Sequence, residues 1–224
     1  MSDAGKHNDN LAIRAAEILS GGTWKHQRAV CIMPAGKAIP FRVAAVMRGL
    51  MTPPNRAFAF LGAEGMEVGE AYSRTIEHVL ADPNLSTWEY ILFVEHDNLP
   101  PPDGFLKLIK QMEAHPEYAA IGGLYWTKGE GGVPQVWGDP KDPVLNFRPQ
   151  PPVPGQLIEC CGVGQGFTLF RLSMFKDAKL RKPWFKTLAS TEEGIGTQDL
   201  YFWGDARKHG YRCAVDCSVL VGHL

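Results

Sequence analysis

The sequence has no long run of apolar residues. None of its apolar segments approaches the roughly 18 consecutive residues that a membrane-spanning helix requires, and the first ten residues, MSDAGKHNDN, are polar. No segment with the apolar core of a secretory signal follows them. We therefore expect no membrane insertion and a cytoplasmic protein.

Cysteine is scarce and shows no pairing pattern. The five cysteines are an odd number and lack the paired spacing of a structural zinc site: Cys31, Cys160, Cys161, Cys213 and Cys217. Disulfides persist mainly in oxidising compartments. We therefore expect five reduced thiols, which excludes a small scaffold held together by disulfides.

An excess of charge of either sign is also missing. The 23 basic and 24 acidic side chains give a net charge of -1, so no broad basic field indicates nucleic acid, and a local patch stays compatible with the composition. With 45% hydrophobic and 21% charged residues, the composition is that of a globular protein rather than a disordered or fibrous one. A chain of 224 residues suffices for one sizeable domain with its own core.

What the sequence does contain is a regular alternation of apolar segments in its first half. Runs with the length of buried strands alternate with segments that have helical spacing. The expected strands cover 28–34, 56–61 and 90–94, and the expected helices cover 39–50, 68–80 and 104–115, the last with Asp103 as N-cap. This alternation implies a mostly parallel sheet with right-handed crossovers, in which ligands bind beyond the carboxyl ends of the strands.

The second half is less regular. Strand-like segments at 118–126 and 166–172 flank a loop over 128–156 that is rich in proline and glycine, and loops of that length are usually functional or mobile. A helix from Gln198 to Lys208 and strands at 211–216 and 218–223 follow. We expect a single-domain α/β sandwich over 29–224, parallel and Rossmann-like in 29–115 and mixed in 116–224. An N-terminal extension over 1–28, with a short amphipathic segment at 11–19, precedes it.

The third expected strand ends in a polar cluster. The stretch EYILFVEHDNLPPPDGFLKLI, residues 89–109, carries an apolar strand directly into Glu95, His96 and Asp97 and then into three prolines. Carboxylates two residues apart at a turn can both face one site, where a divalent cation takes oxygen ligands and keeps positions open for phosphate oxygens. The alternative is that both carboxylates are solvated loop charges and His96 is a surface group.

Five segments, in their order along the chain, carry a resemblance to a known family. They are AVCIMPA, GMEVGEAYSRTIEHVL, YILFVEHDNLPPPDGFLKLI, GVGQGFTLFRLSMF, and GTQDLYFWGDARKHGYRCAVD followed by VLVGH. Together they resemble the nucleotide-diphospho-sugar glycosyltransferases of the GT-A fold, family-2-like enzymes and in particular the small ones of bacteriophages. Two positions depart from the family pattern, since Glu95 replaces the first aspartate of the D-x-D motif and Gln198 replaces the glutamate before the catalytic aspartate.

The resemblance implies a donor site and a metal site. It places a nucleotide sugar, most readily a UDP-sugar, against Pro34, Ala35, Arg74, Glu95, His96 and Asp97. It assigns Mn²⁺ or Mg²⁺ to Asp97 and His223, with Glu95 as a further ligand or as a ribose contact, since imidazole, carboxylate and diphosphate oxygens together suit these cations. From the residues alone, Arg74 fits a surface ion pair with Glu70 better, and a lone histidine after an apolar strand is more often structural.

The resemblance also implies a general base and an acceptor side. Asp199 matches the family's base, which accepts the proton of an acceptor hydroxyl as it attacks the anomeric carbon, so inversion is expected. The same carboxylate would also stabilise the first turn of a helix. The expected acceptor-side residues are Gly164, Trp126, Lys128 and Trp203, with Trp137 as a further candidate. The aromatic ones would act through ring stacking, and the alternative is that several of these side chains are core or loop anchors. Glycines 162, 164 and 166 precede a strand-like run and lack the context of a dinucleotide motif.

These expectations leave three classes of function in view. A glycosyltransferase leads, and a non-catalytic module that binds a nucleotide sugar or polysaccharide and a metal-dependent hydrolase are the alternatives. The acceptor is a hydroxymethylated base in phage DNA, with the enzyme then in the host cytoplasm, or a cell-surface polymer or protein hydroxyl. A DNA acceptor would require basic residues near the site and binding that weakens with salt, and the candidates are Lys128, Arg148, Arg171, Lys179, Arg181, Lys182 and Lys186.

Overall fold

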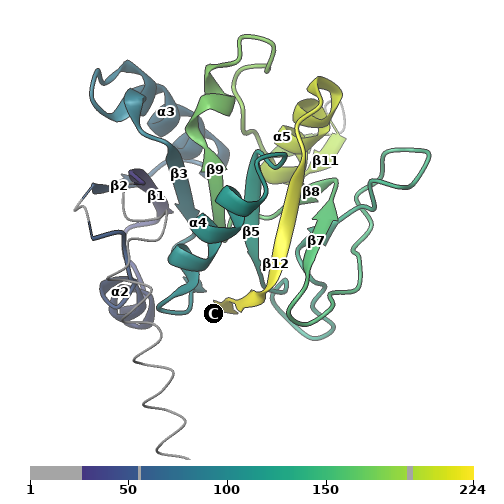
Figure 1. Ribbon diagram of the computed structural model, residues 1–224, viewed down its shortest axis with the longest axis horizontal. Helices are drawn as coiled ribbons and strands as arrows, with labels where there is room; N and C mark the ends of the chain where they lie inside the picture. Colours follow the sequence, from purple (N-terminus) through teal and green to yellow (C-terminus); the bar gives the residue numbers. More distant parts are fainter. Residues whose placement is uncertain (1–26, 55–56, 191–193) are drawn as a thin grey trace, which may run out of the picture.

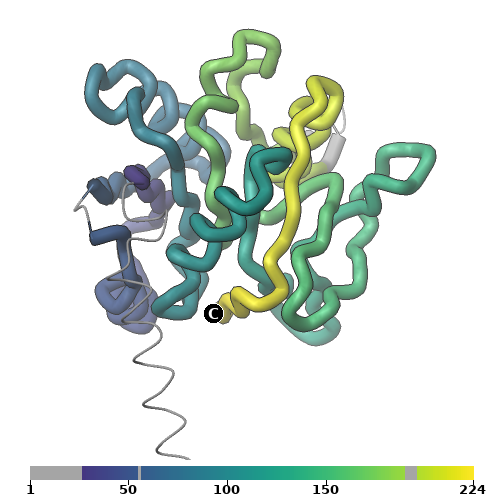
Figure 2. The backbone as a smooth tube through the Cα atoms, in the orientation of Figure 1, coloured from purple at the N-terminus to yellow at the C-terminus, as the bar shows by residue number. Residues whose placement is uncertain are grey.

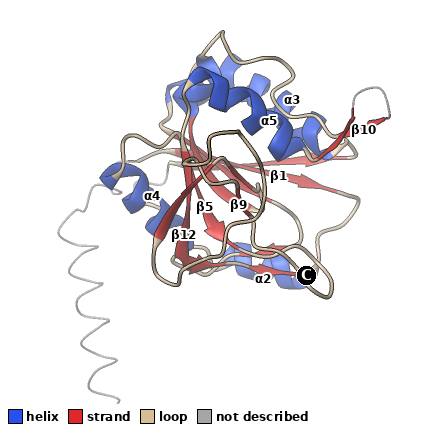
Figure 3. Ribbon diagram, turned by 90° about the vertical axis from the view of Figure 1, so that its right-hand side faces the viewer, coloured by secondary structure: helices blue, strands red, loops and turns tan. Residues whose placement is uncertain are grey.

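The computed structural model describes residues 27–54, 57–190 and 194–224. Most of the expected N-terminal extension, with the amphipathic segment at 11–19, lies outside the described residues. A central twisted sheet runs through the molecule and carries helices on both of its faces (Figures 1 and 3). The expected α/β class is therefore confirmed.

The central sheet has seven strands, and its order is β2–β1–β3–β9–β5–β12–β7. β1 (Ala29–Ala35) lies parallel to both β2 (Phe58–Glu64) and β3 (Tyr90–Val94), as the alternating pattern predicts. β9 (Phe167–Arg171) runs antiparallel between β3 and β5 (Ala120–Leu124). β12 (Cys213–Leu220) is parallel to β5 and antiparallel to β7 (Leu157–Cys160). The N-terminal half is thus parallel and the C-terminal half mixed.

The strand expected over 211–216 and the first part of the strand expected over 218–223 form one strand, and the rest of the second forms β13 (Gly222–His223). β12 runs continuously from Cys213 to Leu220, with a shift of register against β5 between Asp216 and Leu220. Figure 2 shows this yellow segment passing along the teal strand β5. Ser218 interrupts the apolar pattern of the sequence where the strand is irregular. The chain nevertheless continues there as one strand.

Four helices of the described residues cover the two faces of the sheet. α3 (Val68–Ala81) and α5 (Gln198–Ala206) pack on one face, and α2 (Phe41–Arg48) and α4 (Gly104–Ala114) on the other (Figure 3). Side chains alternate along β1. Val30 and Ile32 therefore belong to the core under α3 and α5, and Cys31 and Met33 belong to the core under α2 and α4. Asp103 holds the N-cap position of α4 as expected, but its side chain makes no capping hydrogen bond.

Short elements complete the fold. Three two-stranded ladders join β4 (Asn98–Leu99) to β13 (Gly222–His223), β6 (Val136–Trp137) to β8 (Gly162–Val163), and β10 (Leu188–Ser190) to β11 (Gly194–Gly196). Over 27–54, 57–190 and 194–224, three 3₁₀ helices cover Leu85–Thr87, Leu172–Lys176 and Arg207–His209. All five cysteines are buried and free. Within the described parts of the chain, no helix is long and apolar enough to cross a bilayer.

Candidate active site

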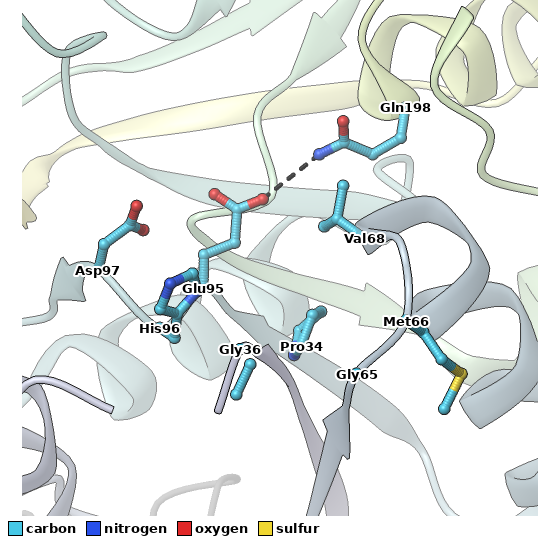
Figure 4. Close-up of a pocket in the computed structure, with 10 residues that line it drawn as sticks. Pro34, Gly36, Gly65, Met66, Val68, Glu95, His96, Asp97 and Gln198 are labelled. Carbon is cyan, nitrogen blue, oxygen red and sulfur yellow. Dashed lines mark hydrogen bonds between the residues drawn. The ribbon is translucent and has the colours of Figure 1, made fainter. Parts of the chain in front are cut away.

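A pocket of about 300 Å³ opens at the carboxyl ends of β1 and β3 (Figure 4). It lies where ligands bind in sheets with a parallel half. Its lining comes from β1, from the loop before α3, from the polar end of β3 and from the first turn of α5: Pro34, Ala35, Gly36, Gly65, Met66, Val68, Glu95, His96, Asp97 and Gln198. Five of the six expected donor-site residues thus share one pocket.

Arg74 is the expected donor-site residue that does not line the pocket. Its guanidinium forms an ion pair with Glu70, at 2.7 Å, one turn earlier on α3, and its side chain is 67% exposed. This is the surface pair that the i, i+4 spacing favours. In this structure the arginine therefore points into solvent.

Glu95 is partly buried and lies near other carboxylates. Its backbone N–H donates to Gly166 O at 3.1 Å, and its Oε1 accepts a long hydrogen bond of 3.4 Å from Gln198 Nε2 (Figure 4). Burial, with the negative charges of Asp199 and Asp97, raises the pKa of Glu95 to about 8. The negative charges of the carboxylates in this site are therefore not fully neutralised by its own cations. A bound metal cation would reduce this repulsion.

Asp97 lies between two groups that carry or can carry positive charge. Its Oδ2 contacts Lys128 Nζ at 2.7 Å and His223 Nε2 at 3.6 Å. Burial opposes ionisation, but the hydrogen bond and charge of Lys128, with the charge of His223, hold the pKa of Asp97 below its usual value. Its Oδ1 is buried and has no hydrogen-bond partner among the described residues. One oxygen of an ionised carboxylate is thus left without a ligand.

His223 reaches the site through the ladder between β13 and β4. The ladder pairs His223 with Asn98, and the Leu224 N–H donates to Asp97 O at 2.9 Å, which fixes the last residues of the chain. His223 Nδ1 lies 2.7 Å from Trp126 O. A carbonyl oxygen only accepts, so Nδ1 carries a proton and the lone pair of the neutral ring is on Nε2, which faces Asp97.

The donor set fits a divalent cation held by two protein side chains. Asp97 offers a carboxylate with one unpartnered oxygen, and His223 offers Nε2 in the tautomer that metal ligands use. Glu95 instead reaches towards Gln198, and no group of three His, Cys, Asp or Glu side chains converges in the described ranges. The remaining positions of a Mn²⁺ or Mg²⁺ ion would fall to oxygens of a diphosphate and water.

Asp199 is buried in the first turn of α5. Its Oδ1 accepts hydrogen bonds from the Thr197 hydroxyl and, at 2.9 Å, from the Leu200 N–H. Burial raises the pKa of Asp199, although both hydrogen bonds act in the opposite direction. The carboxylate thus supports the helix N-terminus, and its raised pKa makes it a stronger proton acceptor than an exposed aspartate.

The expected acceptor-side residues have different surroundings. Trp126 is 40% exposed and presents a ring surface, and Lys128 pairs with Asp97. Trp203 is fully buried and its Nε1 donates to Val163 O at 3.2 Å, so it supports this side of the site from the core and offers no face to an acceptor. Gly164 is tightly packed, since a side chain there would collide with the Tyr125 hydroxyl.

Two site features were not predicted from the sequence. Tyr125 is buried and accepts a hydrogen bond of 2.8 Å from the Gly166 N–H through its hydroxyl. Burial and then the charges of Glu95 and Asp199 raise its pKa well above its usual value, so it remains a neutral phenol beside the carboxylates. The second feature is the ion pair of Lys128, which no local pattern indicates because Asp97 is distant in sequence.

No protein-family model matches the chain, and no curated protein matches it in sequence. Among solved structures, the crystal structure of A197 from STIV is similar, with a TM-score of 0.63 and 16% sequence identity over 88% of this chain and 86% of that chain. At this identity the likeness concerns the fold alone. The protein has a GT-A-like α/β fold in a single domain, with its pocket at the carboxyl edge of the sheet.

Proposed function

We propose that the protein is a metal-dependent glycosyltransferase that moves a sugar from a nucleoside diphosphate, most readily UDP, to a hydroxyl group with inversion. The observation that carries this proposal is the acidic pocket of Glu95 and Asp97 on a GT-A-like fold. His223 lies 3.6 Å from Asp97, and the charge of Asp199 acts on Glu95. A diphosphate and a divalent cation would supply the charges that complement such a site.

In the proposed reaction, each described residue has a defined task. Asp97 and His223 would hold the cation, which neutralises the charge that builds up on the departing diphosphate. Asp199 would accept the proton of the acceptor hydroxyl as the new bond to the anomeric carbon forms and the bond from that carbon to the diphosphate oxygen breaks. Lys128, which contacts Asp97, would move to a phosphate oxygen when the donor binds.

A hydroxyl on modified DNA is one acceptor that this proposal includes. Of the basic residues expected to contact DNA, Arg181 and Lys186 line a second pocket, of about 580 Å³, beside α5. Arg171 instead donates to backbone carbonyls at the end of α4, and Lys182 approaches Glu77 at 4.0 Å. Salt-dependent binding of DNA by the wild-type chain is the expected result for this acceptor, and salt-independent or absent binding would exclude it.

Two observations favour the second candidate function, a binding module without turnover. The Lys128 ammonium already neutralises Asp97, and Gln198, which hydrogen-bonds Glu95, is neutral where the resembling family has a carboxylate. Such a module would bind a nucleotide sugar and release no product.

Release of nucleoside diphosphate separates the two functions. We expect the wild type to release it from a UDP-sugar in the presence of Mn²⁺, and Asp199→Asn to bind the donor normally while turnover falls about 10²- to 10⁴-fold. Leu200→Ala, one residue along the same helix turn, serves as the matched control. Normal turnover by Asp199→Asn would remove the assigned base, and donor binding without any release by the wild type would establish the module.

A further inference from the structure

The segment that links β1 to β2 carries basic and apolar side chains and no acidic one. From Ala29 to Ala63 the sequence contains neither aspartate nor glutamate, while Lys37, Arg42 and Arg48 lie in or just before α2. All three cations are exposed, and none forms an ion pair with any residue that the structure describes. The charged side chains of this segment are therefore all positive.

The same segment exposes large apolar side chains. α2 buries Val43 in the core, while Phe41, at the start of the helix, is 86% exposed. Ile39 before the helix and Met51 after it are 41% and 46% exposed. Single exposed apolar residues are common, but three of them interspersed with three unpaired cations form a surface suited to a partner. We call residues 36–51 the α2 surface.

The α2 surface lies next to the candidate active site. Gly36, its first residue, lines the pocket, and α2 contacts β4, the short strand that directly follows Asp97. Met51, its last residue, donates its backbone N–H to Pro102 O just before α4. Figure 3 shows α2 close to the chain end that carries β13. A partner on the α2 surface would thus reach the rim of the pocket.

We infer that the α2 surface docks the protein on a membrane that displays anionic lipid headgroups. The cations Lys37, Arg42 and Arg48 would be attracted to headgroup phosphates. Phe41 and Ile39 would be stabilised by burial in the apolar layer just beneath those headgroups. A nucleic acid would satisfy the cations and leave the apolar side chains in water. The inference goes beyond the proposed function and does not depend on it, because it concerns where the protein acts and not what it transfers.

Co-sedimentation of the full chain with vesicles tests the inference. We expect binding to vesicles of phosphatidylcholine with phosphatidylglycerol and little binding to phosphatidylcholine alone. Arg42→Ala and Arg48→Ala should each weaken binding about fivefold, and raised salt should weaken it further. Phe41→Ala should weaken it about tenfold, through lost burial of the ring.

Matched variants elsewhere on the surface control for general effects. Val144→Ala removes an apolar side chain that is 73% exposed, and Arg148→Ala removes an exposed cation, both far from α2 in sequence. Neither should change vesicle binding, and all five variants should unfold at the wild-type temperature. Absent binding to anionic vesicles, or binding that the α2 variants and the control variants weaken equally, would overturn the inference. So would tighter binding of an oligonucleotide that needs Arg42 and Arg48 but not Phe41.

Discussion

Lys128 is paired with Asp97, the carboxylate that a metal cation would bind, and its ammonium would attract a diphosphate. Its Nζ lies 2.7 Å from Asp97 Oδ2. The loop that carries Lys128 is closed by two hydrogen bonds of 2.9 Å between Thr127 and Val133. An ammonium at this place opposes binding of a metal ion to the free protein, and it favours a negatively charged donor. The same residue should therefore affect the two ligands in opposite directions.

The first prediction concerns Lys128→Ala. We expect affinity for Mn²⁺ alone to increase about two- to fivefold, because a half-exposed ion pair competes weakly, and affinity for UDP with Mn²⁺ to fall about tenfold. Isothermal titration calorimetry measures both. Lys107→Ala, which removes the pair with Asp103 on α4, is the control and should change neither. A loss of affinity for both ligands would mean that Lys128 only supports the loop.

The second prediction concerns the pH dependence of stability that Glu95 introduces. Its pKa is about 8 in the folded protein and near the ordinary value of 4.5 in the unfolded chain. Between these values the folded state keeps a proton that the unfolded state releases. The contribution of this proton to the free energy of unfolding is complete below pH 4.5. It is lost as the pH rises to 8, at roughly 1.4 kcal/mol per pH unit.

Glu95→Gln should remove this dependence. Without added metal, we expect the variant to exceed the wild type in free energy of unfolding at pH 8 by a few kcal/mol and to approach it at pH 5. Urea denaturation at the two pH values checks this, with Glu130→Gln on an exposed loop as control. If the wild type and Glu95→Gln lost stability in parallel between pH 5 and 8, the carboxylate would not be buried as described.

At the scale of elements, the turn between β8 and β9 holds the strand ends beside the site in place. Gly166 O accepts the hydrogen bond of the Glu95 N–H, and its own N–H donates to the Tyr125 hydroxyl, so this turn joins the end of β3 to the end of β5. A side chain at Gly164 would collide with the Tyr125 hydroxyl and come within 2.6 Å of Gln135 Oε1. The turn therefore requires glycine because neighbouring side chains fill the space.

The third prediction compares two glycines. Gly164→Ala should lower the free energy of unfolding by about 1–3 kcal/mol, since overpacking displaces Tyr125 or Gln135. Gly204→Ala is the control, because a Cβ there meets nothing within 4 Å and the residue is in α5, so stability should rise by up to about 1 kcal/mol. Thermal unfolding measures both. Equal stability of Gly164→Ala and the wild type would show that the turn accommodates a Cβ at this position.

The elements of the parallel half could be predicted from the sequence because their signals are local. A buried strand and an amphipathic helix each show a period within about ten to fifteen residues, so β1, α3, β3 and α4 have nearly their expected bounds. The insertion of β9 between β3 and β5 has no such signal, since it depends on pairing between distant segments. The ladder between β4 and β13 has strands of two residues, too short for any period.

The same limit applies to the site. The polar end of β3 identifies Glu95 and Asp97, because charge directly after a buried strand is unusual. No pattern shows that His223 folds back onto Asp97, because the ladder that brings it there is a tertiary contact. The family resemblance supplies this histidine as well as Asp199. Ring stacking made Trp203 a candidate acceptor contact, but the structure buries it in the core, which was the alternative.

At the scale of the whole molecule, the α2 surface, the pocket and the C-terminal ladder lie on neighbouring parts of the fold. If both proposals hold, the molecule binds a nucleotide sugar at the carboxyl edge of the sheet while α2 places that edge near a membrane. The two parts are separable by mutation, since Phe41 and Arg48 do not line the pocket. Loss of vesicle binding should therefore leave donor binding intact.

The proposed function depends above all on whether the pocket binds a nucleoside diphosphate through a cation held by Asp97. A thermal-shift series of nucleoside diphosphates and their sugars, each with and without Mn²⁺, on the wild type and Asp97→Asn answers this question. We predict stabilisation by one nucleotide that depends on Mn²⁺ and is absent in Asp97→Asn, about 2.7 kcal/mol at a ligand concentration of about 100 times Kd. A folded wild type that no nucleotide stabilises, with or without the metal, would contradict the proposal.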